Sequence, residues 1–472
     1  ITVRTPGTAA SYWLESVVKP AAQVFDYQIG QRVEDGKIGG QSVAGAGRLE
    51  TTASKDVYNF TVAAEQTVVF DSLPGYTIMD GSRLVGLDSS TDYGVLTGHR
   101  VFRLPAGRYQ ITVAKTAASG TYWFTSFVDP SAQLFTYQVG QMVENGKIGG
   151  ITVPGAGNLE TTASTDIYSF SLDAAKKVVF DSLPGYTVMD GSRLRGLDSD
   201  TDYGVLTGHH EFDLPAGDYQ ITVSKPGSSG TYWLNTFVKP EVQVFDYRIG
   251  QKIEQNKIDG QAAPGAGNVE TTASKDVYNF SLDNPGTAVF DSLPGYTIMD
   301  GSRLKSVSTG TDYGVLTGHR EFNLPAGDYQ ITVEKTGATG TYWLSSFLKP
   351  APQAFEYEVG QKVENGKVNG ANMPGAGNLE TTASKDVYRF SVATDELVVF
   401  DGDGYWTGLG GSHLIRTATG QDLGPLDGHR EYLLLAGDYE IVVEKTGWSG
   451  TYAFTSFHKP LAQVFQLSVG DK

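Results

Sequence analysis

Three aspartates recur at a fixed spacing in segments rich in glycine and serine, and carboxylate oxygens are ligands that calcium prefers. The sets are Asp71, Asp80 and Asp92; Asp181, Asp190 and Asp202; and Asp291, Asp300 and Asp312. Loop carbonyls beside them would complete the roughly six to eight oxygens that calcium takes. The sequence therefore predicts one calcium site per set, and Glu50 with Asp56 forms a second candidate pair.

Each of these aspartates also has an explanation without a metal. Aspartate in a loop commonly accepts a hydrogen bond from the backbone beside it and so caps a turn. The sequence contains no Asp-x-Asp-x-Asp-Gly loop of the EF-hand kind, so the spacing does not decide between calcium and turn capping. Calcium is the one cofactor that the sequence suggests, and both interpretations stay open.

Four histidines recur as well, each after a glycine: His99, His209, His319 and His429. Histidine in a serine hydrolase works with a serine on a nucleophile elbow, and histidine in a zinc peptidase lies in a His-Glu-x-x-His motif. Neither pattern occurs in the sequence. We therefore expect these histidines to be turn or strand-start residues, and the chain not to be an enzyme.

An irregular segment recurs with few changes and is altered in its last copy: at 70–84 (FDSLPGYTIMDGSRL), 180–194, 290–304 and 400–414 (FDGDGYWTGLGGSHL). One position in it is aromatic in all four copies: Tyr76, Tyr186, Tyr296 and Trp406. Exposed aromatic side chains bind sugar rings or partner proteins, so we predict a ligand or partner interface there. Packing into a core or against a neighbouring domain is the alternative. The altered last copy predicts a different neighbour for the fourth repeat, or none.

The whole chain follows a period of 110 residues, because TTASKDVYNF begins at Thr51 and its counterparts begin at Thr161, Thr271 and Thr381. Such a period suits an independent domain better than one turn of a solenoid. The predicted organisation is the final strands of a preceding repeat at 1–20, repeats at 21–130, 131–240, 241–350 and (divergent) 351–460, and the start of a following unit at 461–472.

Within a repeat, apolar and polar residues alternate, as in strands with one buried face. In the first repeat the expected strands lie at 57–62, 67–73, 101–104, 109–113 and 121–127, with turn sequences between them. Proline in the short connections, as in VKP and LKP, stiffens them. The sequence predicts an all-β fold of four tandem jelly-roll-like or Ig-like β-sandwich domains in a semi-rigid rod.

The chain has 472 residues, of which 53 are acidic and 36 are basic, with a formal net charge of −17. A surface of that sign repels phosphate backbones and anionic lipids, which argues against nucleic acid and membrane surfaces as partners. Cysteine is absent, so disulfides and cysteine nucleophiles are excluded. No run of about 18 apolar residues is present, so we expect no membrane span.

The location predicted from these features is extracellular or on the cell surface, as a secreted bacterial protein. Large secreted bacterial proteins often lack cysteine, whereas eukaryotic ectodomains usually contain disulfides. The chain opens with ITVRTPGT, in the middle of a strand pattern. We therefore expect a processed form or a piece of a longer protein.

Several motifs follow one another in each repeat: an opening strand that ends in glycine (VFDYQIGQ), then DVYNF, VVFDS, LPAGRYQITV and GTYWF. In this order they resemble the bacterial pre-peptidase C-terminal domain, and the resemblance covers every repeat. It implies jelly-roll-like β-sandwiches strung along large secreted and surface proteins. It also implies calcium binding in some members, assistance to secreted peptidases in others, and a spacer role in many.

The function we expect is that of a non-catalytic structural repeat protein, a stalk or a building block of an extracellular filament, sheath or surface adhesin. Its expected partners are neighbouring copies of itself or further repeats of the same longer chain. The alternative is a multivalent, calcium-dependent module that binds a surface polysaccharide or protein, in which repetition raises avidity.

Overall fold

The computed structural model describes residues 16, 18–72, 78–183, 187–293 and 297–459. These residues form strands and four short 3-10 helices, so the chain is all-β, as predicted. Within these ranges, none of the helices has both the length and the apolar character that crossing a membrane requires.

Alternating burial along the strands confirms the period-two pattern. In β6 (Asp56–Val62) buried residues alternate with less buried ones from residue 58 on, and in β11 (Gly107–Val113) they do so from residue 109 on. The other elements of the first repeat are β1 (Gln23–Asp26), β2 (Arg32–Glu34), β3 (Lys37–Ile38), β4 (Gln41–Ser42), β5 (Arg48–Leu49), β7 (Gln66–Asp71), η1 (Met79–Gly81), β8 (Ser82–Gly86), β9 (Asp92–Gly94), β10 (His99–Leu104), β12 (Gly120–Thr121) and β13 (Phe124–Val128).

The same order of elements recurs in the other repeats. The second repeat has β14 (Gln133–Thr136), β15 (Met142–Glu144), β16 (Lys147–Ile148), β17 (Ile151–Thr152), β18 (Asn158–Leu159), β19 (Thr165–Leu172), β20 (Lys176–Ser182), η2 (Thr187–Gly191), β21 (Ser192–Gly196), β22 (Asp202–Gly204), β23 (His209–Leu214), β24 (Gly217–Ser224), β25 (Gly230–Thr231) and β26 (Leu234–Val238). The third repeat has β27 (Gln243–Asp246), β28 (Lys252–Glu254), β29 (Lys257–Ile258), β30 (Gln261–Ala262), β31 (Asn268–Val269), β32 (Asp276–Leu282), β33 (Gly286–Ser292), η3 (Thr297–Gly301), β34 (Ser302–Ser306), β35 (Asp312–Gly314), β36 (His319–Leu324), β37 (Gly327–Val333), β38 (Gly340–Thr341) and β39 (Leu344–Leu348). The fourth repeat has β40 (Gln353–Glu356), β41 (Lys362–Glu364), β42 (Lys367–Val368), β43 (Ala371–Asn372), β44 (Asn378–Leu379), β45 (Lys385–Val392), β46 (Glu396–Gly402), η4 (Gly408–Gly411), β47 (Ser412–Arg416), β48 (Gln421–Gly424), β49 (His429–Leu434), β50 (Gly437–Glu444), β51 (Gly450–Thr451) and β52 (Phe454–His458).

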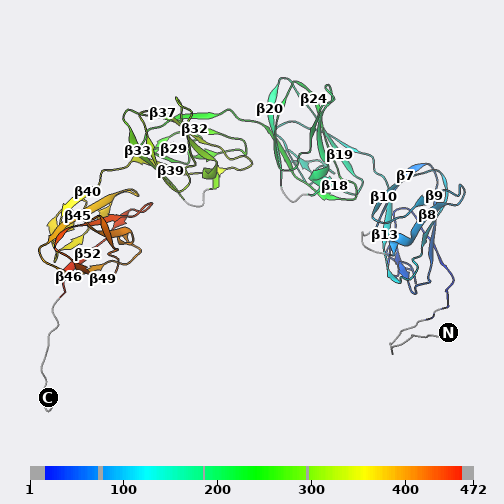
Figure 1. Cartoon of the computed structure of the whole chain (residues 1–472). Helices are drawn as coiled ribbons and strands as arrows, with labels where there is room; N and C mark the ends of the chain where they lie inside the picture. The colour runs from blue at the N-terminus through cyan, green and yellow to red at the C-terminus, as the bar shows by residue number, and fades with distance from the viewer. Residues whose placement is uncertain (1–15, 17, 73–77, 184–186, 294–296, 460–472) are drawn as a thin grey trace, which may run out of the picture. The chain divides into compact units, whose positions relative to one another are not determined.

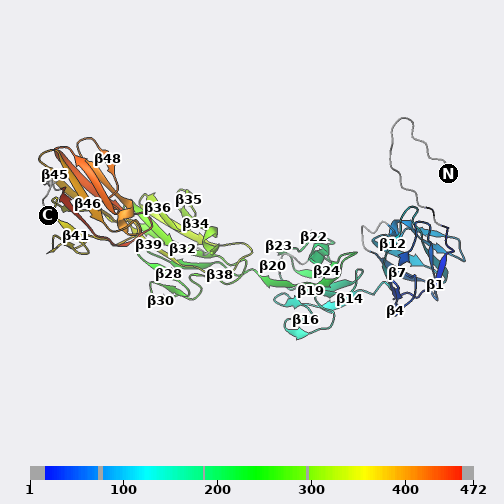
Figure 2. The ribbon, with the colours of Figure 1, turned by 90° about the horizontal axis from the view of Figure 1, so that it is seen from below.

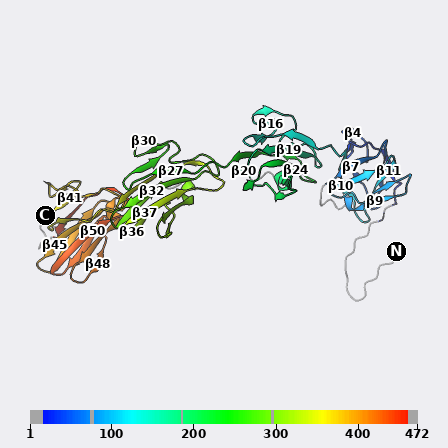
Figure 3. The same cartoon turned by 90° about the horizontal axis from the view of Figure 1, so that it is seen from above.

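Each repeat contains a five-stranded, a six-stranded and a two-stranded sheet. In the first repeat the orders are β1-β6-β11-β8-β9, β10-β7-β13-β2-β3-β4 and β12-β5. Strand β1 runs parallel to β6, and the other pairs of the five-stranded sheet are antiparallel. Figure 1 labels β7, β8, β9, β10 and β13 in this repeat, and Figures 2 and 3 show its sheets from below and from above.

The core of a repeat lies between the five-stranded and the six-stranded sheet. Tyr58 and Phe60 of β6 meet Phe124 and Phe70 of the other sheet, with ring centroids 5.3 Å and 6.2 Å apart. One such apolar cluster occurs in each repeat. Because aromatic pairs gain about 0.5–1.5 kcal/mol beyond their buried area, this packing holds the two sheets together.

The prediction of four separate jelly-roll-like or Ig-like sandwich domains in a semi-rigid rod is wrong. The chain forms two compact units, Ile1–Lys239 and Pro240–Lys472, with two repeats in each. Inside each unit the repeats contact each other through partly buried polar side chains, as neighbouring repeats of a β-solenoid contact each other, instead of standing as separate domains. The parallel pairing of β1 with β6 also departs from the antiparallel sheets of an Ig domain. The period and the proline connections suggested separate domains because neither reveals a contact between side chains 91 residues apart.

The repeat boundaries at 21–130, 131–240, 241–350 and 351–460 stay predictions. The predicted final strands of a preceding repeat at 1–20 lie outside the described residues, apart from residues 16 and 18–20. The predicted start of a following unit at 461–472 lies wholly outside them.

Candidate functional site

The recurrent histidines lie directly opposite aspartates in the six-stranded sheets. His99 begins β10 and faces Asp71, the last residue of β7. Its Nδ1 donates a hydrogen bond to Asp71 Oδ1 over 2.6 Å. The strand register alone brings the two side chains together, because opposite residues of antiparallel strands have Cβ atoms about 5 Å apart. The pair recurs in the later repeats as His209 with Asp181, His319 with Asp291, and His429 with Asp401.

The second repeat covers the pair of the first repeat. Thr162 Oγ1 donates to Asp71 Oδ2 over 2.5 Å, so both carboxylate oxygens accept a hydrogen bond. Gly227 lies against the histidine, since a Cβ added there would stand 3.3 Å from His99 Cβ. Its φ of +82° is one that glycine adopts without strain. The Gly227 amide donates to the Thr162 carbonyl over 2.9 Å, which joins these two residues into one surface.

The third and fourth repeats meet in the same way. Thr382 Oγ1 donates to Asp291 Oδ2 over 2.5 Å, and a Cβ on Gly447 would stand 3.3 Å from His319 Cβ. We call each of these four-residue contacts an inter-repeat joint: Asp71, His99, Thr162 and Gly227 in the first unit, and Asp291, His319, Thr382 and Gly447 in the second. In both joints the histidine and aspartate side chains are less than one fifth exposed.

The pair of the fourth repeat has the same geometry in an open setting. His429 Nδ1 and Asp401 Oδ1 are 2.5 Å apart, yet the two side chains are 61% and 44% exposed. Because the carboxylate accepts its hydrogen bond, it raises the pKa of His429, and Glu431 adds to the effect. Within the described residues, this is the least covered of the four Asp–His pairs.

A lysine after the last strand of three repeats ties the connecting segment back to its own repeat. Lys239 binds Glu211, with Nζ 2.9 Å from both carboxylate oxygens. Lys349 with Glu321, and Lys459 with Glu431, make the same contact. Each of these glutamates also lies within 3.7 Å of Nε2 of its repeat's histidine. The first repeat has Val101 and Asp129 at these positions, so its connection lacks this ion pair.

The structure does not gather the aspartates of a set into one site. Asp71, Asp181 and Asp291 pair with histidines, as described above. Asp80, Asp190 and Asp300 each face a lysine, at 3.8, 2.9 and 3.1 Å, and the Lys225 ammonium lowers the pKa of Asp190. Asp92, Asp202 and Asp312 each accept from the amide two residues on, over 2.8–2.9 Å, as the turn-capping interpretation predicts. Among the described residues no group of three or more His, Asp or Glu side chains is placed to hold a metal ion, so the calcium prediction has no ligand group there.

Glu50 and Asp56, the second calcium candidate, have separate surroundings. Glu50 accepts from Gln23 Nε2 over 2.9 Å at the surface. Asp56 is fully buried, and the Tyr122 hydroxyl donates to its Oδ2 over 2.5 Å. Tyr58 in turn hydrogen-bonds Tyr122 over 2.7 Å.

Burial raises the pKa of Asp56 to about 7, although the hydrogen bond from Tyr122 acts in the opposite direction. Its counterparts in the other repeats have the same surroundings and the same raised pKa: Asp166, Asp276 and Asp386. Each of the four carboxyl groups has one oxygen, Oδ1, that is buried without a hydrogen-bond partner. The arrangement favours a neutral carboxylic acid over a metal ligand.

Of the predicted interface aromatics, only Trp406 belongs to the described residues, because Tyr76, Tyr186 and Tyr296 lie outside them. Trp406 is 87% exposed, and its neighbour Tyr405 is 62% exposed. The Lys445 ammonium lies 5.4 Å from the ring centroid of Tyr405. The loop that contains Tyr405 and Trp406 begins beside the exposed Asp401–His429 pair. There the Gly428 amide donates a hydrogen bond to the Asp403 carbonyl over 3.4 Å.

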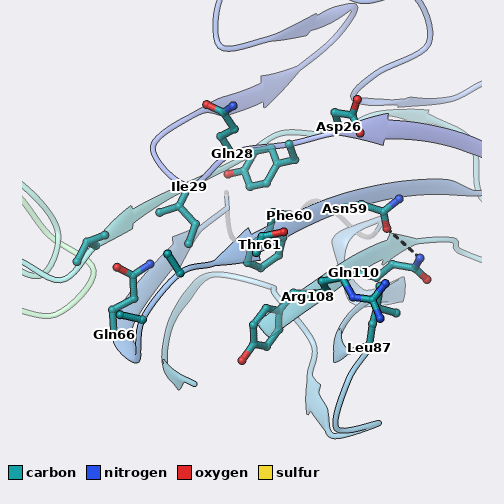
Figure 4. A pocket seen from close by; sticks show the side chains of 15 residues that line it. Asp26, Gln28, Ile29, Asn59, Phe60, Thr61, Gln66, Leu87, Arg108 and Gln110 are labelled. Atoms are coloured by element: carbon teal, nitrogen blue, oxygen red, sulfur yellow. Dashed lines mark hydrogen bonds between the residues drawn. The ribbon is translucent and has the colours of Figure 1, made fainter. Parts of the chain in front are cut away.

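A groove of about 1010 Å³ runs along the first repeat beside the five-stranded sheet. Its lining includes Asp26, Arg108 and the hydrogen-bonded pair Asn59–Gln110, at 3.0 Å (Figure 4). Comparable grooves of about 830 and 520 Å³ lie in the third and fourth repeats. In the fourth repeat an Arg389–Glu440 ion pair takes the place of the two amides. A ligand common to all repeats would therefore meet different charges.

Sequence reasoning found the histidines and aspartates of the joint but assigned them to turns and to calcium. It missed Thr162, Gly227 and their counterparts altogether. The threonine stands in the repeated TTAS motif and the glycine in a turn, and both residue types are common in turns for local reasons. One difference between the repeats does mark the position of the joint glycine. The first repeat has Ala117 where the later repeats have Gly227, Gly337 and Gly447.

No protein-family model matches the chain, and none of the curated proteins matches it. Similar solved structures include the pre-peptidase C-terminal domain of a collagenase from Bacillus anthracis, at 20% identity over 23% of this chain and 97% of that chain, with a TM-score of 0.18. They also include the CUB1-EGF-CUB2 domains of rat MASP-1, at 11% identity over 69% and 100% of the chains with a TM-score of 0.20, and those of human MASP-1/3, at 11% over 44% and 98% with 0.16. The likeness to the pre-peptidase C-terminal domain is at most one of β fold, and nothing about function follows from it.

Proposed function

We propose that the chain is a non-catalytic structural repeat protein, the stalk or a building block of an extracellular filament, sheath or surface adhesin. The observation that carries this proposal is the inter-repeat joint, which has the same contacts and distances between repeats one and two as between repeats three and four. A flexible linker alone would leave neighbouring repeats free to rotate. Polar contacts that are buried and directional favour one arrangement of two neighbours over all others.

The lysine–glutamate pairs support the same role. They hold the start of the connecting segment against its own repeat. Composition supports the location: an acidic chain without cysteine suits a secreted bacterial protein. The partners in this proposal are neighbouring copies of the chain or further repeats of a longer one.

The multivalent binding module has less support. Avidity from repetition requires that each repeat offers the same site. The grooves differ in size and charge between repeats, and the aspartates of each set have protein partners of their own.

The test measures whether two joined repeats keep one arrangement. Because the chain has no cysteine, Gln41→Cys and Ile151→Cys introduce two unique spin-label sites at equivalent exposed positions of repeats one and two. We expect a narrow distribution of label-to-label distances by electron paramagnetic resonance. Thr162→Val removes the hydroxyl of the joint and broadens the distribution, whereas the matched control Thr52→Val leaves it unchanged. A broad distribution in the chain with an intact joint would contradict the proposal.

A further inference from the structure

We propose that the five-stranded sheets of the first and third repeats bind a neutral polysaccharide, each through one row of side chains on the face turned away from the core. This row, which we call the amide row, consists of an aspartate, an asparagine and a glutamine. Its members are Asp26, Asn59 and Gln110 in the first repeat and Asp246, Asn279 and Gln330 in the third. Such a binding function goes beyond the structural role and does not depend on it.

Strand pairing places the three side chains of a row side by side. Asn59 of β6 lies opposite Asp26 of β1 on one side and opposite Gln110 of β11 on the other. The next residues along the strands, Phe60 and Tyr109, pack in the core, so the row lies on the opposite face of the sheet. The third repeat has the same register. Because the sheet fixes the row, little ordering is required when a ligand binds.

One hydrogen bond within the row leaves a donor and an acceptor next to each other. Gln110 Nε2 donates to Asn59 Oδ1 over 3.0 Å. Gln330 Nε2 donates to Asn279 Oδ1 over the same distance. This bond uses neither the amide nitrogen of the asparagine, which is a donor, nor the amide oxygen of the glutamine, which is an acceptor. A hydroxyl group both donates and accepts, so two neighbouring sugar hydroxyls match these two groups.

Each row lies in a groove that also contains an exposed aliphatic side chain. The grooves have volumes of about 1010 Å³ in the first repeat and about 830 Å³ in the third. Leu87 is 42% exposed in the first groove, and Val307 at the same position of the third is 59% exposed. Figure 4 shows the bonded pair Asn59–Gln110 between Asp26 and Leu87. A sugar ring has hydroxyl groups at its edge and apolar C–H groups on its faces, so it can contact both kinds of side chain at once.

The charges in the grooves favour an uncharged sugar. In the first groove Arg108 is already paired with Asp88, over 2.7 Å, and the Asp26 side chain is exposed. The third groove is lined by three carboxylates and one guanidinium: Asp246, Asp283, Asp328 and Arg248. Carboxylates repel anionic sugars such as uronic acids. They accept hydrogen bonds from neutral hydroxyl groups.

The second and fourth repeats lack the complete row, which predicts two sites per chain. In the second repeat Ser169 stands at the asparagine position and Thr136 at the aspartate position. In the fourth repeat Arg389 binds Glu440 over 2.9 Å, so an ion pair replaces the two amides. A neutral hydroxyl makes a weaker hydrogen bond than a charged partner and would not displace it.

NMR titration of the full chain tests the inference through the side-chain amide signals of asparagine and glutamine. The ligands are neutral hexasaccharides of glucose, mannose, galactose and N-acetylglucosamine, with a hexamer of galacturonic acid as the anionic comparison. We expect at least one neutral hexasaccharide to shift the amide signals of both rows, with a Kd of about 1 mM, because few hydrogen bonds and no new ion pair form. The galacturonic acid hexamer should shift none of them.

The variants replace each amide pair by the ion pair that the fourth repeat already accommodates. Asn59→Arg with Gln110→Glu should remove the binding shifts of the first repeat only. Asn279→Arg with Gln330→Glu should remove those of the third repeat, and the four substitutions together should abolish binding. The matched control Asn323→Ala removes an exposed amide of the third repeat outside the groove and should leave both sites unchanged. Unchanged backbone signals away from the substitutions show that each variant keeps the fold.

Three results would overturn the inference: no shift with any neutral hexasaccharide, equal shifts with the galacturonic acid hexamer, or binding that survives the four substitutions. The first result would leave a protein as the occupant of the grooves. Failure of the proposed structural role is seen separately, because the spin-label distances report on the inter-repeat joint and the titration reports on the grooves.

Discussion

The joint between the first two repeats and the open pair at the end of the fourth contain the same two side chains in opposite surroundings. Asp71 and His99 are 14% and 18% exposed, and Asp401 and His429 are 44% and 61% exposed. The hydrogen bond between them is 2.6 Å long in the first case and 2.5 Å in the second. The neighbour therefore contributes the burial of the pair, whereas the repeat itself sets the geometry.

Two neighbouring repeats contribute different parts of the contact between them. The strand register places an aspartate opposite a histidine in every repeat. The carboxylate that accepts the hydrogen bond from the neighbouring repeat is therefore positioned by its own repeat alone. The next repeat supplies a threonine hydroxyl and a glycine that permits close approach. Stability then comes from nearest-neighbour contacts, as in other repeat proteins.

A rise in pH should have the largest effect on stability. It acts on a buried carboxyl group that is present in all four repeats, whether the Asp–His pair of the repeat is covered or exposed. The buried carboxyl groups Asp56, Asp166, Asp276 and Asp386 have a pKa of about 7 in the fold and 3.8 as the ordinary value. The folded chain then binds more protons than the unfolded chain between about pH 4 and 7, so the free energy of unfolding falls as pH rises through this window. The loss is on the order of 4 kcal/mol per repeat.

Urea unfolding at several pH values measures this loss. Asp56→Asn should flatten the pH dependence of the first repeat, and Asp386→Asn that of the fourth, by equal amounts. An unchanged profile in both variants would show that other groups cause the pH dependence. A flattening in only one would show that the repeats differ in their cores as well as in their joints.

Removal of the aspartate should destabilise the covered Asp71–His99 pair more than the exposed Asp401–His429 pair. Asp71→Ala leaves the partly buried side chains of His99 and Thr162 without their acceptor, which costs about 2–4 kcal/mol in the free energy of unfolding of the first unit. Asp401→Ala breaks an exposed pair and should cost less than about 1 kcal/mol in the second unit. Urea unfolding with one fluorescent reporter in each unit measures both. Equal losses in the two variants would mean that the neighbour adds nothing to the pair.

The positions of the strands could be predicted from the sequence, whereas the pairing of the strands and the contacts between repeats could not. Alternation in VYNFTV and YQITV placed β6 and β11 within two residues of their observed bounds, because burial of one face of a sheet enforces period two. The same alternation says nothing about which strands pair, so the parallel contact of β1 with β6 stayed hidden. The two-repeat units were missed since the Thr162–Asp71 and Thr382–Asp291 contacts within them join side chains 91 residues apart.

The candidate site was predicted as a set of residue types but not as an arrangement. Asp71 and His99 recur visibly, yet calcium and turn capping explained them as well as pairing did. Thr162 contacts Asp71 across 91 residues, and nothing in one repeat's pattern marks the residue that its neighbour will meet. The altered loop of the fourth copy predicts a different neighbour for that repeat, or none, and this stays a prediction.

The smallest expected effect is in the titration of the open pair itself. Hydrogen bonds to Asp401 and Glu431 raise the pKa of His429 above 6.5, so its protonated form is favoured in the fold. The contribution of this pair to stability is complete below pH 6.5 and is lost as pH rises through the folded pKa. The His429 ring proton shift, followed by NMR, should give a pKa that Asp401→Asn lowers towards 6.5. A pKa that Asp401→Asn leaves unchanged would mean that the Asp401–His429 pair does not hold together in solution.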